Sequence, residues 1–300
     1  MRGYAIPIVL LSAVLHAAWN AQMKGSTDRS RFLASMTAAV GLLAGLSIPF
    51  VPAPSRAAWA CIGLSSALHL FYNFLLLQNY RISNFSTVYP IARGVSPLLI
   101  TVGALVLMRQ RPHIIAVAGV AMISIGILYL AKEQSRMGAR ATLFALGTGV
   151  AIAAYTVTDT IGVQRSGSTL SYVVWIFASY LLMPPGLLLL QNPIRFEKIQ
   201  DSLRAVGAGA LSMTAYFLVL WATHYVDVGI VSALRETSVL WALVIAHFLL
   251  GEPFTWKRFC SASAVCVGIV LLIPGLAPGR SPNAKSDESS LRMFHKHPCL

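Results

Sequence analysis

Two arginines, Arg93 and Arg235, lie inside hydrophobic stretches of the chain, 142 residues apart. An arginine at the centre of a membrane helix costs about 2.5–3.5 kcal/mol on insertion scales. Such a residue therefore usually faces a bundle interior or a water-filled cavity, where it can bind an anion or pair with a carboxylate. Glu236 follows Arg235 directly, and adjacent side chains on a helix point roughly 100° apart. One arrangement pairs Glu236 with Arg93 and leaves Arg235 towards a cavity. The alternative is an ion pair that only locks the structure.

Two polar pairs at helical spacing are the next candidates. His16 and Asn20 are four residues apart and share one helix face, and Tyr155 and Asp159 repeat this spacing 139 residues later. Such pairs either line a cavity or hold helices together by hydrogen bonds. Trp19 lies between the first two and either stacks on a substrate or anchors its helix at the membrane interface. We predict substrate binding for all five residues.

The run around Arg93 predicts a broken helix. Pro90 and Pro97 each lack a backbone N–H, and Gly94 permits close approach of a neighbour. A helix broken here would expose backbone carbonyls beside Arg93, with Tyr89 as a further substrate contact, and broken helices at the membrane midplane often form substrate sites. The alternative is a proline kink that only shapes packing.

Other intramembrane polar residues add two expectations. Asp159 and Glu236 are candidate proton carriers, because burial disfavours the charged form of a carboxyl group. His69 and Asn73 form a further pair at a spacing of four residues and are additional cavity candidates.

The composition identifies an integral membrane protein. The chain has 300 residues, of which 56% are hydrophobic and 11% charged, and its mean hydropathy is +0.69. Apolar stretches of about 17–25 residues recur throughout, each long enough to cross the hydrocarbon core. We expect an all-α fold, because helices satisfy their own backbone hydrogen bonds in lipid and the stretches lack the alternation of barrel strands.

Several classes of function are disfavoured. The net charge of +13 comes from Lys and Arg in short connections, without a basic stripe, so we expect no nucleic-acid partner. The four cysteines form no C-x-x-C pair, and no metal site or cofactor is predicted. The sequence contains no Gly-rich phosphate loop, G-x-S-x-G or H-E-x-x-H motif, which argues against an enzyme and against ATP-driven transport.

The chain divides into two related halves. Residues 74–130 overlay residues 216–272 without a gap, placing Arg93 on Arg235, Ser96 on Ser238 and Gly126 on Gly268. We predict a first five-helix repeat over 1–135, a second over 136–275 and a disordered polar tail over 276–300. Five spans in each half require the second to enter the membrane in the opposite direction, so the repeat is inverted. The ten predicted spans are 5–23, 32–50, 57–78, 85–108, 114–130, 139–163, 170–190, 205–225, 228–250 and 256–273.

The chain resembles the EamA family of the drug/metabolite transporter superfamily. The resemblance covers residues 5–273 and rests on His16-Ala17-x-Trp19-Asn20, on the run from Tyr89 to Pro97, and on Ala233-Leu234-Arg235-Glu236-Thr237-Ser238 followed by Gly251-Glu252. It implies ten helices in two inverted repeats, a central cavity and alternating access without ATP hydrolysis. Family members often carry Gly-Glu in the first copy too, where this chain has Arg109-Gln110.

We therefore predict a secondary transporter of a small polar or anionic metabolite, an amino acid or organic anion, with efflux favoured over uptake and with proton coupling possible. The alternative is a non-transporting assembly or sensor subunit whose buried charges are structural. The predicted location is the inner (plasma) membrane. The distribution of basic residues favours an outside N-terminus, whereas the resemblance implies cytoplasmic termini, and we follow the resemblance. The oligomeric state is left open.

Overall fold

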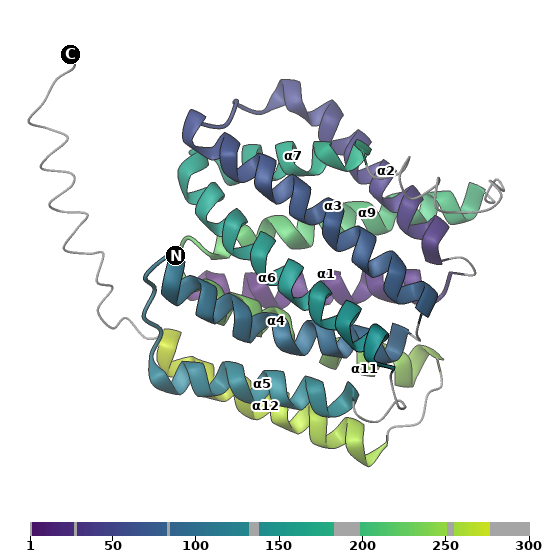
Figure 1. Cartoon of the computed structure of the whole chain (residues 1–300), viewed down its shortest axis with the longest axis vertical. Helices are drawn as coiled ribbons and strands as arrows, with labels where there is room; N and C mark the ends of the chain where they lie inside the picture. The colour runs from purple at the N-terminus through teal and green to yellow at the C-terminus, as the bar shows by residue number, and fades with distance from the viewer. Residues whose placement is uncertain are drawn as a thin grey trace, which may run out of the picture.

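The computed structural model of the chain describes residues 2–26, 29–82, 85–131, 138–182, 199–250 and 255–276, and within these ranges the secondary structure is helical (Figure 1). The α-helices are α1 (Arg2–Lys24), α2 (Arg29–Ser47), α3 (Trp59–Ile82), α4 (Phe85–Leu107), α5 (Ile114–Ala131), α6 (Ala139–Ser166), α7 (Thr169–Ala178), α9 (Ile199–Ala222), α10 (Val228–Arg235), α11 (Ser238–Leu250) and α12 (Trp256–Leu276). Short 3-10 turns are η1 (Ile48–Phe50), η2 (Arg56–Ala58) and η3 (Ser179–Leu182).

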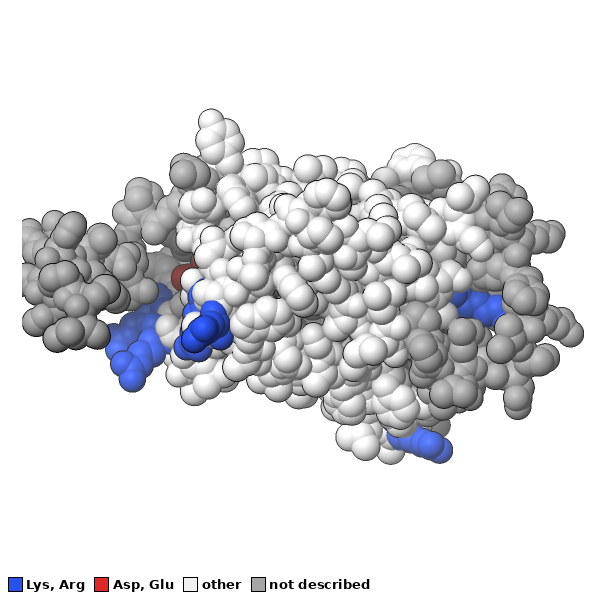
Figure 2. Space-filling view, turned by 90° about the horizontal axis from the view of Figure 1, so that it is seen from above, with Lys and Arg blue, Asp and Glu red and all other residues white. Residues whose placement is uncertain are grey.

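The predicted all-α membrane protein is confirmed. Seven helices in the described ranges are long and apolar enough to cross a membrane, and Ile114–Tyr129 and Thr169–Leu182 are shorter apolar helices. The helices run side by side (Figure 1). Large apolar side chains such as those of Leu46, Ile114 and Val270 are exposed on their outer faces. Figure 2 shows Lys and Arg towards the two ends of the helices, with an uncharged band between them. This distribution fits a multi-pass protein whose central band contacts lipid.

Most predicted spans agree with the helix bounds to within a few residues, with two qualifications. The span predicted over 170–190 is helical up to Leu182, and its remainder lies outside the described residues. The span predicted over 228–250 is two helices, α10 and α11. The join between the predicted repeats (132–137) and residues 277–300 of the predicted tail also lie outside the described residues.

Helices from the two ends of the sequence interlock. Helix α1 packs against α9, α10 and α11, whereas α6 packs against α3 and α4. Helices α5 and α12 lie against each other at one end of the row (Figure 1). Their backbones approach closely where Gly119 faces Gly268: a Cβ on Gly119 would lie 2.7 Å from the carbonyl oxygen of Gly268. The first helix of each half is thus held mainly by helices of the other half.

The broken helix predicted at Pro90, Gly94 and Pro97 is wrong, because α4 is one continuous helix from Phe85 to Leu107. Pro97 cannot donate to the carbonyl of Arg93, four residues earlier. The Ser96 hydroxyl donates to that carbonyl instead, at 3.3 Å, which replaces the missing bond. A Cβ on Gly94 would lie 2.8 Å from Leu128 of α5, so this glycine serves helix packing.

The interruption lies in the second copy instead, between α10 and α11 at Glu236 and Thr237. Two N–H groups there, those of Val239 and Leu240, donate three residues back, to the carbonyls of Glu236 and Thr237, both at 2.9 Å. These are the bonds of a 3-10 turn, which is tighter than an α-helix. The chain therefore tightens at the position that follows Arg235.

Candidate functional site

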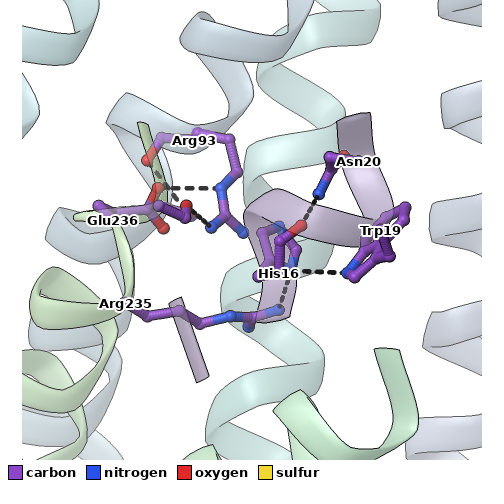
Figure 3. A network of polar contacts seen from close by, with 8 residues as sticks. His16, Trp19, Asn20, Arg93, Arg235 and Glu236 are labelled. Carbon is purple, nitrogen blue, oxygen red and sulfur yellow. Dashed lines mark hydrogen bonds and ion pairs between the residues drawn. The ribbon is translucent and has the colours of Figure 1, made fainter. Parts of the chain in front are cut away.

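The predicted ion pair between Arg93 and Glu236 is present. Arg93 Nε lies 2.9 Å from Glu236 Oε2, and both side chains are buried. A terminal nitrogen of Arg93 also donates to the Ser238 hydroxyl at 3.4 Å. Helix α4 supplies the arginine, and the turn between α10 and α11 supplies the carboxylate (Figure 3). The pair links the two halves of the chain at membrane depth.

A buried cavity lies beside this pair. Its volume is about 70 Å³, counted as the space open to the centre of a water molecule. The wall is formed by residues of α1, α2, α3, α4, α6, α7, η3, α9 and α10, and of the predicted substrate contacts it includes His16, Trp19, Asn20, Arg93, Tyr155 and Arg235. Glu236 is not part of this wall. The question left open by the sequence is therefore answered: Arg235 faces the cavity, and Glu236 faces Arg93.

Arg235 has no carboxylate partner in the described part of the chain. A terminal guanidinium nitrogen lies 3.4 Å from His16 Nδ1, and the guanidinium carbon lies 5.8 Å from the centre of the Tyr216 ring. The buried Nε has no hydrogen-bond acceptor among the described residues. The side chain is 9% exposed, so its charge is balanced neither by an ion pair nor by bulk water. A buried cation in this situation is suited to receive an anion from the cavity.

His16 joins the arginine to the first helix (Figure 3). Trp19 Nε1 donates to His16 Nδ1 at 3.2 Å, and the two rings are perpendicular, with centroids 5.0 Å apart. Because both Trp19 and Arg235 can only donate, Nδ1 is the acceptor and a neutral His16 carries its proton on Nε2. Trp19 is buried in the cavity wall and is therefore not an interfacial anchor.

The amide of Asn20 presents an unused acceptor to the cavity. Its Nδ2 donates to the carbonyl of His16 at 2.7 Å, while its buried Oδ1 has no donor among the described residues. Asn73 makes the same bond to the carbonyl of His69, at 2.8 Å, and both residues of this second pair also line the cavity. The spacing of four residues therefore marks cavity-lining pairs on α1 and α3.

Asp159, predicted to line the cavity, lies behind its wall instead. Tyr155 reaches the cavity and stacks on His69, with ring centroids 4.1 Å apart. One turn later, Asp159 is fully buried and bonded to the hydroxyls of Tyr172 and Tyr216. Of these two rings, that of Tyr216 from α9 belongs to the cavity wall, whereas Tyr172 and Asp159 do not. The side chain of Tyr89 lies outside the described residues, although its backbone belongs to α4.

Sequence reasoning missed the aromatic part of the wall, which consists of Tyr72, Phe177, Tyr180 and Tyr216. Single aromatic residues in apolar stretches look like ordinary membrane-helix residues, so no local pattern distinguishes them.

The departure at Arg109-Gln110 has a structural role. Gln110 Oε1 accepts from the backbone N–H of Val228, the first residue of α10, at 3.2 Å. The first N–H groups of a helix have no partner within it, and Asp227 before α10 makes no side-chain cap. Gln110 of the first half thus caps a helix of the second half.

Comparison with known proteins agrees with this architecture. Residues 139–273 match the EamA-like transporter family. No curated protein matches the chain. A solved structure described as "Crystal structure of protein" is similar with a TM-score of 0.71 and 16% identity, covering 90% of this chain and 96% of that one, which shows a shared fold. The family match confirms the resemblance read from the sequence over the second half of the chain: residues 139–273 match the EamA-like transporters, a family of the drug/metabolite transporter superfamily.

Proposed function

We propose that the protein is a secondary transporter that carries a small amino acid or related organic anion across the membrane by alternating access. The observation that carries this proposal is the buried guanidinium of Arg235, which lines a cavity and has no carboxylate partner in the described part of the chain. The proposed architecture is ten spans in two inverted five-helix repeats, in a plasma membrane.

The packing of the helices supports the inverted repeats. Under the 142-residue shift, α9 corresponds to α3 and α10 with α11 corresponds to α4. Helix α1 packs on α9, α10 and α11, and α6 packs on α3 and α4, so the two first helices have matching neighbours. Transporters with inverted repeats place their substrate site between the two copies, and the wall of this cavity contains residues from both of the proposed repeats.

The position of the cavity supports alternating access. The wall uses the second half of α1, the first part of α2 and the second half of α3, which all lie towards the membrane side where α1 ends. Contacts between the halves close the opposite side. Ser55 N donates to Ser166 O at 3.2 Å, the Ser171 hydroxyl donates to Pro52 O, and Gln110 binds Val228. Opening that side requires these contacts to break.

The cavity favours a substrate with both an anionic group and a hydrogen-bond donor. Arg235 supplies the cation, Asn20 Oδ1 is a buried acceptor without a donor, and the aromatic rings supply apolar surface. A carboxylate and an ammonium group on one small molecule would satisfy both, since ion pairs and cation–π contacts are strong in a desolvated site. Glu236 neutralises Arg93, so we assign this ion pair a structural role and not a substrate-binding role.

A matched set of three compounds tests the substrate class. L-phenylalanine has both charged groups, 3-phenylpropanoate lacks the ammonium, and 2-phenylethylamine lacks the carboxylate. Thermal stabilisation of the purified protein should be largest for phenylalanine, smaller for phenylpropanoate and absent for phenylethylamine. Stabilisation by the amine alone, or by none of the three, would contradict the proposal.

Flux measurements test the transport step and its direction. Proteoliposomes loaded with the bound compound should exchange it with the same compound outside, without ATP. The proposed physiological direction is efflux. Binding without exchange in proteoliposomes would instead favour a sensor subunit.

A further inference from the structure

Asp159 is the second carboxyl group at membrane depth, and its surroundings differ from those of Glu236. Its side chain is fully buried in α6. Tyr172 donates to Oδ1 at 3.1 Å, and Tyr216 donates to Oδ2. Among the described residues no Lys or Arg forms an ion pair with it. Neutral donors alone therefore hold this carboxylate.

The polar groups around Asp159 come from α3, α6, α7, η3 and α9. They are Ser65 and His69 of α3, Tyr155 of α6, Tyr172 of α7, Tyr180 of η3 and Tyr216 of α9. His69 Nδ1 lies 3.0 Å from the carbonyl of Ser65, so its proton is on Nδ1 when this bond forms. Asp159 can therefore take up a proton, which removes its negative charge, without breaking an ion pair.

Glu236 is less suited to that role. Its carboxylate lies 2.9 Å from Arg93 Nε, and both side chains are buried. A proton on Glu236 would leave the arginine charge buried and unpaired, which is strongly unfavourable. Protonation of Asp159 is therefore less unfavourable than protonation of Glu236.

Tyr216 connects Asp159 with the cavity. Its ring forms part of the cavity wall and lies 5.8 Å from the guanidinium carbon of Arg235, while its hydroxyl donates to Asp159. Tyr172 donates to the same carboxylate but does not line the cavity. The two tyrosines therefore form a natural pair for comparison.

We propose that Asp159 binds a proton when the anion binds at Arg235, and that Tyr216 couples the two sites. This rests on the transport function proposed above. The Tyr216 hydroxyl passes its proton to the Asp159 carboxylate and takes one from a hydronium ion in the cavity, which leaves water, so the protein gains one proton. Protonated Asp159 then donates a hydrogen bond to the Tyr216 oxygen, and the tyrosine O–H turns to the cavity, where it donates a hydrogen bond to a carboxylate beside Arg235. Proton uptake and anion binding thereby favour each other.

Infrared spectroscopy of the full-length protein in lipid, without ligand, tests the proton site. Lowering the pH produces the carbonyl stretch of every carboxyl group that becomes protonated, so the Asp159 component is the part of the wild-type signal that is missing in Asp159→Asn. We expect such a component, and we expect it to remain in Glu236→Gln. Identical titrating signals in the wild type and in Asp159→Asn would overturn the assignment. This readout needs no substrate and so remains valid if the proposed transport function fails.

Calorimetric titration tests the coupling, with 3-phenylpropanoate as the probe. Repeating the titration in buffers of different ionisation enthalpy gives the number of protons taken up per bound anion. We expect net uptake in the wild type and in Tyr172→Phe, and none in Asp159→Asn or Tyr216→Phe. Equal uptake in Tyr216→Phe and Tyr172→Phe would exclude Tyr216 as the link. No binding of the probe to any form would count against the transport proposal and leave the infrared result standing.

Discussion

The two arginines, Arg93 and Arg235, align under the 142-residue shift but differ in their partners. Arg93 forms a buried ion pair with Glu236, at 2.9 Å. Arg235 lies against the neutral groups of His16 and Tyr216, with an unused Nε. One charge is therefore neutralised within the protein, and the other remains for a ligand.

A single position accounts for the difference. The 142-residue shift that aligns the arginines places Gly94 of the first half on Glu236 of the second. Gly94 packs against Leu128 on an uninterrupted helix, whereas Glu236 lies at the turn between α10 and α11 and crosses to Arg93. The carboxylate that follows Arg235 in the sequence neutralises Arg93. This asymmetry converts a symmetric pair of charges into one structural contact and one candidate binding site.

The largest effect is expected for Arg93→Gln. Removing one partner of a buried ion pair leaves the other charged and unpaired, at a cost of about 3–5 kcal/mol. Denaturant-induced unfolding in detergent micelles should show a loss of stability of this order. The double variant Arg93→Gln, Glu236→Gln should recover much of it, because neither charge is then left alone. Equal losses in the single and double variants would show that the ion pair is not the source of stability.

Arg235→Gln should have the opposite profile. With no carboxylate partner to leave behind, this substitution should change stability less than Arg93→Gln does. Binding of 3-phenylpropanoate should weaken by about 2 kcal/mol or more, which is roughly 30-fold. Calorimetry of both arginine variants compares them directly. Similar losses of affinity in a folded Arg93→Gln and in Arg235→Gln would remove the distinction between the two sites.

Much of this architecture could be predicted from the sequence, because the length and hydropathy of an apolar stretch identify a membrane-spanning helix. Most predicted span bounds agree with the helices within a few residues. The buried charges were also informative, since an arginine in an apolar stretch needs an ion-pair partner or a cavity. Arg93 pairs with Glu236, and Arg235 lines the cavity.

The errors came from features that depend on neighbouring helices. Two prolines predicted a break in α4, but the Ser96 hydroxyl satisfies the carbonyl that Pro97 leaves free. The interruption after Arg235 contains neither proline nor glycine, so local sequence does not mark it. Asp159 was placed in the cavity wall because Tyr155 shares its face, and only the packing of Tyr216 reveals that it is covered.

A smaller effect is expected where the two halves differ outside the membrane core, at Gln110. Because Gln110 Oε1 accepts the N–H of Val228 at the start of α10, Gln110→Ala removes a helix cap. Loss of such a cap typically costs about 0.5–2 kcal/mol. Unfolding in micelles should show this decrease, while Gln110→Glu, which keeps an acceptor at a positive helix end, should be tolerated. A neutral Gln110→Ala would show that the contact does not contribute to the stability of α10.

The smallest effect is expected at His224, in the connection that follows α9, away from both arginines. Its Nε2 lies 3.0 Å from the Thr169 hydroxyl, and partial burial lowers the pKa of His224 from 6.5. The unfolded chain then binds a proton at a higher pH than the folded protein does. Stability from this residue is therefore fully present above the unfolded pKa and is lost as the pH falls through the lowered folded pKa. Unfolding of His224→Gln between neutral and acidic pH should lack this component of the pH dependence. An identical pH profile in the variant would assign the acid sensitivity to other groups, Asp159 among them.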